Sequence, residues 1–152
     1  MLHRSDMIKI LGEKGEHLVK DFFLSQGCEV IMSDDPFDRE KDMLVDGKKV
    51  EVKTEVPYYK EWAVTINSKH KNQIKKCLLV DRLIFVVLPT YSMKKEITLM
   101  EAPKPNHRFY FNRTFGNRHM HCFPLDDARF LHKITDQSIV NDMLKYNPSK
   151  VT

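Results

Sequence analysis

The first segment with a clear hydrophobic period covers residues 6–26 and predicts an amphipathic helix that Gly27 ends. Apolar side chains recur on one face at helical spacing, at Ile8, Leu11, Leu18, Val19, Phe22 and Phe23. Gly12 and Gly15 fall within the same arc. The helix backbone is therefore expected to lie close to whatever element it covers at these two positions.

Three polar residues near the middle of this helix differ in direction. At 100° per residue, Glu16 lies at the margin of the apolar face, whereas Glu13 and His17 point away from it. Glu16 is therefore the acid expected to reach a neighbouring element, with Glu13 as the alternative and a solvated flank as the non-functional interpretation.

Residues 42–53 alternate around an Asp-Gly pair at 46–47, which is the strongest short-range signal for a β-hairpin. The register that this turn implies pairs Val45 with Lys48, Leu44 with Lys49, Met43 with Val50 and Asp42 with Glu51. One side of the hairpin is then apolar, with Met43, Val45, Val50 and Val52. Asp42, Glu51 and Lys53 point to the other side.

The remaining pattern predicts strands over 28–32, 62–67, 83–88 and 96–100, with 83–88 as a buried central strand. A basic helix follows Ser68, which can cap it, and its inward stripe is Ile74, Cys77 and Leu78. Two short helices are expected over 126–131 and 138–146. Residues 1–152 then form a single α/β domain, with a core over about 8–90 and a C-terminal extension over 91–152.

The composition of the 152 residues, with 41% apolar and 30% charged, excludes a disordered or collagenous chain. The longest apolar run, at 83–88, is too short for a membrane span, and charges interrupt the N-terminus where a signal segment would be apolar. Cys28, Cys77 and Cys122 are odd in number and not closely paired, so reduced thiols in the cytoplasm are expected. A net charge of +4 mildly favours a polyanionic partner. No membrane partner is expected, because no apolar run is long enough to span a bilayer.

The two acids opposed on the hairpin are the strongest chemical signal in the chain. Like charges directly opposite each other on a β-ladder are destabilising, so Asp42 and Glu51 favour a bound cation between them. Mg²⁺, with Mn²⁺ as a substitute, is the hard cation that one or two carboxylates usually hold. The alternative is a hairpin whose outer charges serve only solubility.

At this point the sequence resembles the PD-(D/E)xK nuclease superfamily. Asp42, eight intervening residues and then Glu51-Val52-Lys53 are similar to its signature, and the run Gly-Glu-Lys-Gly-Glu at 12–16 resembles its acidic first helix. The resemblance covers residues 8–90. It departs from the family at Lys41, which stands where the family has a proline before the aspartate.

The resemblance implies a restriction-endonuclease-like core, a central mixed β-sheet flanked by helices in the order α-β-β-β-β-α-β, with C-terminal additions. It also implies that Asp42, Glu51 and the backbone carbonyl of Val52 bind the metal ion. Lys53 would hold and polarise the attacking water or offset charge on the phosphate. Glu16 would orient a water at the metal or help to hold a second ion.

The implied function is a Mg²⁺-dependent endonuclease of the resolvase, repair or phage type, with DNA favoured over RNA and a homodimer as a common form of small members. Two alternatives stay open. One is a catalytically inactive nucleic-acid-binding module of the same fold. The other is an RNA-cleaving relative whose first helix carries a His beside an acid, as His17 stands beside Glu16 here.

Two segments are candidates for nucleic-acid contacts. In related nucleases the helix after the Glu-x-Lys strand borders the site, which points to Gln73 and then to Lys69 and Ser68, against an ordinary solvated helix face. Residues 102–121 hold four Lys or Arg, including Arg108 and Arg113, with three His, four aromatics and no acid. The alternative is that these aromatics pack in the core. Zinc at 119–122 is disfavoured because its ligands stand too close in an extended stretch.

Overall fold

The computed structural model of the chain describes residues 2–35, 38, 40–58, 62–89, 95–103 and 111–147. The strands of the larger sheet are β1 (Val30–Met32), β2 (Met43–Val45), β3 (Lys48–Glu55), β5 (Arg82–Val87), β6 (Ile97–Glu101) and β9 (Arg129–Ile134). Those of the smaller sheet are β4 (Ala63–Asn67), β7 (Phe111–Phe115) and β8 (Arg118–Pro124). The helices are α1 (Arg4–Ser25), α2 (Lys71–Leu79), the short 3-10 turn η2 (Leu125–Asp127) and α3 (Gln137–Leu144).

The larger sheet is mixed, in the order β1-β2-β3-β5-β6-β9, and the smaller one has the order β4-β8-β7. Only β3 and β5 run parallel in the larger sheet, with α2 on the connection between them, and the other neighbours are antiparallel. This confirms an α/β fold with a mixed central sheet flanked by helices. It also confirms the predicted order through β5 and the central place of β3.

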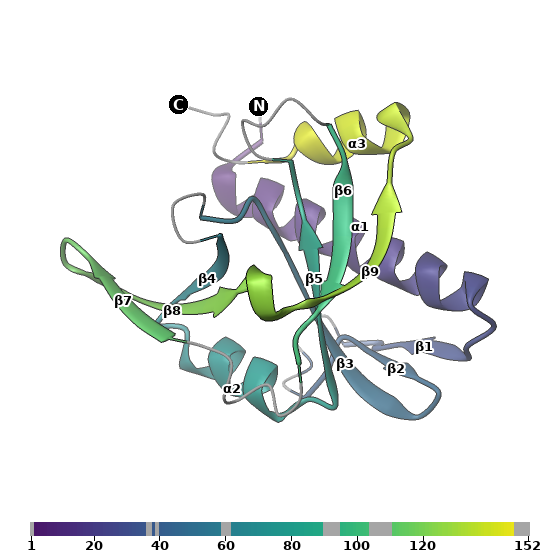
Figure 1. Ribbon diagram of the computed structural model, residues 1–152, viewed down its shortest axis with the longest axis horizontal. Coiled ribbons are helices and arrows are strands. Elements are labelled where there is room, and N and C mark those ends of the chain that lie inside the picture. The colour runs from purple at the N-terminus through teal and green to yellow at the C-terminus, as the bar shows by residue number, and fades with distance from the viewer. Residues whose placement is uncertain are drawn as a thin grey trace.

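Helices α1 and α3 cover one face of the larger sheet, and α2 with the smaller sheet covers the other (Figure 1). Strand β5 shows why, because its side chains alternate between the two layers. Ile84 and Val86 pack with α1 and α3, whereas Leu83 and Phe85 pack with α2 and β4. A strand buried on both faces accounts for the continuous apolar run that predicted it.

Three of the four predicted pairs of the hairpin are confirmed, with Met43 opposite Val50, Leu44 opposite Lys49 and Val45 opposite Lys48. The fourth is wrong, because β2 begins at Met43 and the N–H of Asp42 donates to the carbonyl of Val50, so Asp42 does not pair with Glu51 in the ladder. The turn residues Asp46 and Gly47 both have positive φ, 48° and 78°, as a two-residue turn of this class requires. The apolar side of the hairpin is buried as predicted, at Met43, Val45, Val50 and Val52.

Three local predictions are wrong. Ile8 is 51% exposed, because the buried stripe of α1 is narrow and consists of Met7, Leu11, Gly15, Val19 and Phe23. Residues 126–131 form only the turn η2 and the start of β9, because pairing with the edge of β6 determines the conformation of a segment with an ambiguous period. Ser68 does not cap α2, whose N-cap is His70.

The placement of β4 adds a further difference from the predicted arrangement. Its sequence pattern predicts a strand of the central sheet, yet it pairs with β8 in the smaller sheet.

Helix α3 and strand β6 match their predictions closely. No helix in the described ranges is long and apolar enough to cross a membrane, and none of Cys28, Cys77 and Cys122 forms a disulfide. The assignment of residues 1–152 to one domain stays a prediction.

The two glycines of α1 provide a matched stability test. A Cβ at Gly15 would overlap Thr54 Oγ1 and lie 2.9 Å from Thr54 Cβ, whereas nothing lies within 4 Å of one at Gly12. The predicted close approach is therefore confirmed at Gly15 and wrong at Gly12.

We expect Gly15→Ala to lower the free energy of unfolding by about 1–3 kcal/mol through overpacking. Gly12→Ala should raise it by about 0.5–1 kcal/mol, because it removes a glycine from a helix interior. Urea unfolding of the two variants measures both changes. Equal effects would mean that α1 does not pack on β3 at Gly15.

Candidate functional site

The site begins where the two hairpin strands separate. The N–H of Asp42 donates to the carbonyl of Val50 at 2.8 Å, which is the last backbone bond between the two strands in this direction. The N–H of Val52 then donates to Asp42 Oδ2 at 2.7 Å. The Asp42 side chain, rather than a neighbouring strand, therefore accepts the hydrogen bond from this part of the β3 edge. This bond holds the Asp42 carboxylate in place.

The sheet places Glu51 and Lys53 on the face that α2 covers. In the β3–β5 register Glu51 lies beside Leu83 and Lys53 beside Phe85, and both of these β5 residues pack in the layer with α2. Glu51 is only 3% exposed. Lys53 Nζ donates to Gln73 Oε1 of α2 at 3.2 Å, so the residue picked from the basic helix does meet the predicted lysine.

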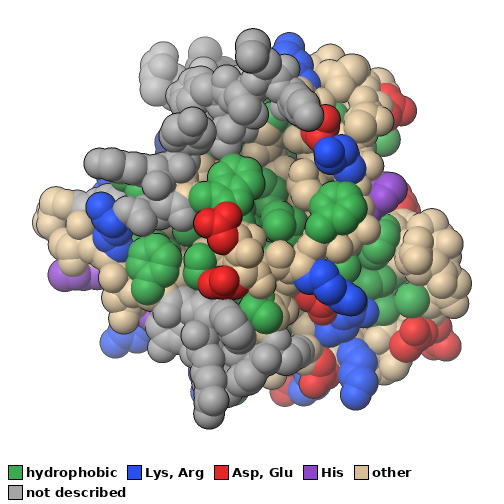
Figure 2. All heavy atoms as spheres, viewed as in Figure 1, with side chains coloured by type: hydrophobic (Ala, Val, Ile, Leu, Met, Phe, Trp, Pro, Cys, Tyr) green, Lys and Arg blue, Asp and Glu red, His purple; other side chains and the backbone are tan. Residues whose placement is uncertain are grey.

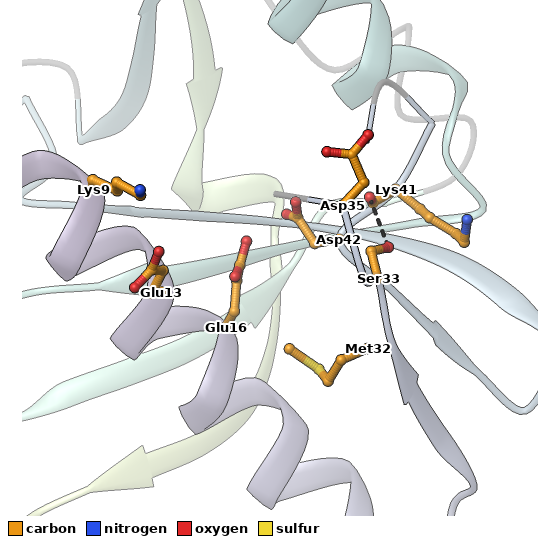
Figure 3. Close-up of a pocket in the computed structure, with 8 residues that line it drawn as sticks. All are labelled: Lys9, Glu13, Glu16, Met32, Ser33, Asp35, Lys41 and Asp42. Carbon is orange, nitrogen blue, oxygen red and sulfur yellow. Dashed lines mark hydrogen bonds between the residues drawn. The ribbon is translucent and has the colours of Figure 1, made fainter. Parts of the chain in front are cut away.

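Glu16 reaches the same place from α1. Its side chain points toward Asp42, whereas Glu13 lies further from Asp42, near Lys9 (Figure 3). Glu16 is half-buried and Glu13 is exposed, as the direction of each on the helix predicts. His17 is exposed and lines a separate surface pocket with Lys14 and residues of α3, so it does not join Glu16 at this place.

These side chains line one cleft of about 610 Å³, bounded by α1, the hairpin and α2. Its residues include Ile8, Lys9, Glu16, Asp42, Glu51, Val52, Lys53, Gln73 and Lys76. A smaller hollow of about 200 Å³ adjoins it and shares Lys9, Glu16 and Asp42 (Figure 3). The opening to solvent explains why Ile8 stays exposed.

Lys76 is the residue of this cluster that the sequence-based site omitted. Its Nζ lies 2.8 Å from Asp42 Oδ1 and 2.9 Å from Glu51 Oε2, and its side chain is 13% exposed. The sequence held a signal, since Lys69, Gln73 and Lys76 have the i, i+4, i+7 spacing of one helical stripe, although Lys69 precedes α2 in the structure. That stripe could not show that the third residue would bridge the two acids.

Burial and mutual repulsion set the protonation of the three carboxyl groups. Burial, together with a hydrogen bond to Asp42 and its charge, raises the pKa of Glu51 to about 9. Burial and the nearby Asp42 charge raise the pKa of Glu16 to about 8. Burial acts against ionisation of Asp42 as well, but its pKa is lowered because Glu51, Lys76 and the Val52 N–H stabilise the charged form.

The same acids stabilise the charge on Lys76. Burial would lower the pKa of its ammonium group, yet Glu51 and Asp42 outweigh burial and raise it. Lys76 thus balances only part of the negative charge of the three acids, and the cluster keeps protons on the acids that its positive charges do not balance.

The donor set suits a hard cation. Within the described ranges no three or more His, Cys, Asp or Glu side chains form a ready-made metal site. Glu51 Oε2, however, is fully enclosed and accepts no hydrogen bond, although the Lys76 ammonium lies beside it. Because the N–H and C=O of one strand residue point to the same edge, the Val52 carbonyl faces the same gap. Carboxylate and carbonyl oxygens are the ligands that Mg²⁺ takes.

Other predicted contact residues lie away from the cleft. Ser68 Oγ pairs with His121 Nδ1 at 3.1 Å. Lys69 is exposed, and its N–H donates to Asn67 Oδ1. Arg113 is on β7 in the smaller sheet, and Arg108 lies outside the described residues.

No protein-family model matches the sequence, and neither a curated protein nor a solved structure matches the chain significantly. The case for a function therefore rests on the cleft itself.

Proposed function

We propose that the protein is a metal-dependent nuclease of the PD-(D/E)xK type that hydrolyses phosphodiester bonds of DNA, with an endonuclease favoured. The observation that carries this proposal is the convergence of Glu16, Asp42 and Glu51, from three separate elements, with Lys53 on one open cleft. The acidic helix, the hairpin and the β3–α2–β5 connection support a restriction-endonuclease-like core around it.

The charges in the cleft favour a phosphodiester substrate over a neutral one. Acids on the floor would repel a polyanion, and a cation held by them removes this repulsion. Asp42, Glu51 and the Val52 carbonyl would hold Mg²⁺ or Mn²⁺. When bound, the ion would supply Lewis-acid polarisation of a phosphate oxygen and ease deprotonation of the attacking water.

The other cleft residues act directly on water and phosphate. Lys53 donates to the attacking water or to a non-bridging phosphate oxygen, where negative charge grows in the transition state. Gln73, which accepts from Lys53 Nζ, holds the ammonium in position. Glu16, at the rim beside Asp42, accepts a hydrogen bond from a water and thereby orients it.

A cleavage panel tests this proposal. Linear duplex, single-stranded and branched DNA, and RNA of the same sequence, are incubated with Mg²⁺, Mn²⁺, Ca²⁺ or EDTA. We expect cleavage of DNA in Mg²⁺ and Mn²⁺ only, and its loss in Glu51→Gln. Absence of cleavage on every substrate, or cleavage that persists in EDTA, would contradict the proposal.

Metal binding has a readout of its own. Mg²⁺ or Mn²⁺ at 100 times its dissociation constant should stabilise the folded state by about 2.7 kcal/mol, because it binds only there. For a chain of this size that is about 5–11 °C in the thermal midpoint. Asp42→Asn should lose most of this shift. Asp21→Asn, the same change at an exposed position of α1, should retain it, and equal shifts in both variants would remove Asp42 from the metal site.

A binding module without activity is the second candidate, and Lys76 favours it. An ammonium ion that already contacts both acids supplies a positive charge that the site would otherwise need from a metal. Tight DNA binding with no cleavage in the whole panel would favour this candidate over the nuclease.

A further inference from the structure

The smaller sheet ends in a two-stranded ribbon. Strand β4 pairs with β8 only as far as Asn67 opposite Met120, whereas β7 and β8 continue to Phe115 opposite Arg118. Residues 113–119 therefore form a hairpin tip beyond the end of the β4–β8 ladder. Figure 1 shows this ribbon projecting from the rest of the molecule.

The tip carries no acid, and its described side chains are polar. Because residues paired across two strands share a face, Arg113 lies with Met120, and Thr114 lies with His119. Thr114 Oγ1 and His119 Nδ1 lie 3.2 Å apart, which agrees with this register. From 111 to 124 the chain has two arginines, two histidines and no Asp or Glu.

The ribbon is joined directly to the start of the helix that borders the cleft. The N–H of Ser68 donates to the carbonyl of His119 at 2.7 Å. Residues 67–80 continue the acid-free stretch, with Lys69, Lys71 and Lys75 exposed. Helix α2 then spans about 13 Å along its axis and brings Gln73 and Lys76 into the cleft.

The space-filling view agrees with this charge distribution. At the side of Figure 2 where the ribbon projects, Lys or Arg and His side chains are visible among the described atoms, and acidic side chains are not. The ribbon tip and the exposed side of α2 thus form one basic surface that leads to the carboxylates. We call it the ribbon–helix surface, residues 67–75 and 111–121.

We propose that the ribbon–helix surface binds double-stranded DNA, with the β7–β8 tip in the major groove and the lysines of α2 on the phosphate backbone. This proposal rests on the proposed nuclease function and names its substrate class. The major groove of B-form DNA, about 12 Å wide, admits a two-stranded ribbon. The deep, narrow major groove of duplex RNA does not.

The exposed side chains described on the ribbon suit a groove of a duplex. They are Asn112, Thr114, Asn117, Arg118 and His119, which can donate or accept hydrogen bonds. Such groups read base edges or contact phosphates in a groove.

Fluorescence anisotropy in EDTA tests the proposal without cleavage. The probes are a labelled 20-base-pair DNA duplex, one of its single strands, and an RNA duplex of the same sequence. Arg118→Ala combined with Lys71→Ala should weaken binding of the DNA duplex about five- to tenfold. It should also reduce the slope of log affinity against log salt by about two, one unit for each lost phosphate contact. Lys48→Ala, at the exposed β2–β3 turn, is the control and should change neither quantity.

The outcomes separate this inference from the nuclease proposal. An unchanged salt slope in the double variant, or tighter binding of the single strand or the RNA duplex, overturns the inference even if the wild type cleaves DNA. Weaker binding of the DNA duplex and a smaller salt slope in the double variant support the inference even if the wild type cleaves nothing. Matching thermal midpoints of the double variant and the wild type confirm that the folded state is compared.

Discussion

Replacing Lys53 with alanine is expected to slow DNA cleavage about 10²–10³-fold while DNA and metal affinity stay near the wild-type values. This is the scale for removing one preorganised electrostatic group that acts in the transition state. The carboxylates rather than Lys53 would hold the metal, and Lys53 Nζ donates to Gln73 Oε1. Single-turnover cleavage in Mn²⁺ gives the rate, and binding in Ca²⁺ gives the affinity.

Two further variants show whether position or charge matters at Lys53. Lys53→Arg should restore the rate only in part, because a planar fork replaces a compact ammonium ion. Gln73→Ala should reduce the rate less than Lys53→Ala, since it removes the acceptor that holds Lys53 but leaves the charge. If Lys53→Ala cleaves at the wild-type rate, Lys53 has no part in the chemistry.

The parts of this site that the sequence predicted depend on local geometry. The Asp-Gly turn determines the hairpin register, and the register alone separates Met43 and Val45 from Glu51 and Lys53. Helical periodicity separates Glu16 from Glu13 in the same way. In both cases the periodicity of a single hairpin or helix is enough to predict the direction of each side chain from its position in the sequence.

The parts that the sequence did not predict depend on how elements meet. Lys76 bridges Asp42 and Glu51 only because α2 crosses the face of β3, and periodicity within α2 does not contain that information. Strand β4 joins β8 across a long stretch of chain, although its own pattern is that of a central strand. The edge strand β9 likewise needs β6 as a partner before its strand conformation becomes favourable.

Replacing Lys76 with methionine should have opposite effects on the metal-free and the metal-bound protein. Without metal, removal of the ammonium leaves two buried acids without their counter-ion, and we expect a loss of about 2–4 kcal/mol in the free energy of unfolding. For this chain length that is roughly 4–16 °C in the thermal midpoint. Lys75→Met, the same change at the exposed neighbouring position, should cost far less.

Lys76→Met lowers the stability of the metal-free protein, but it should strengthen the binding of Mn²⁺. The ammonium of Lys76 lies between Asp42 and Glu51, where a cation would contact the same oxygens, so the two positive charges compete. Lys76→Met should therefore bind Mn²⁺ more tightly than the wild type in titration calorimetry, by about tenfold for each 1.4 kcal/mol of competition removed. Its thermal midpoint should also rise more with Mn²⁺ than that of the wild type.

Two other outcomes would contradict this prediction, provided that Lys75→Met equals the wild type. Weaker Mn²⁺ affinity in Lys76→Met would mean that the lysine supports the metal site, and unchanged affinity would mean that the lysine does not share it. If neither the wild type nor Lys76→Met binds Mn²⁺, the ion pair that Lys76 makes with Asp42 and Glu51 is the charge balance of the cleft, as the binding-module hypothesis requires.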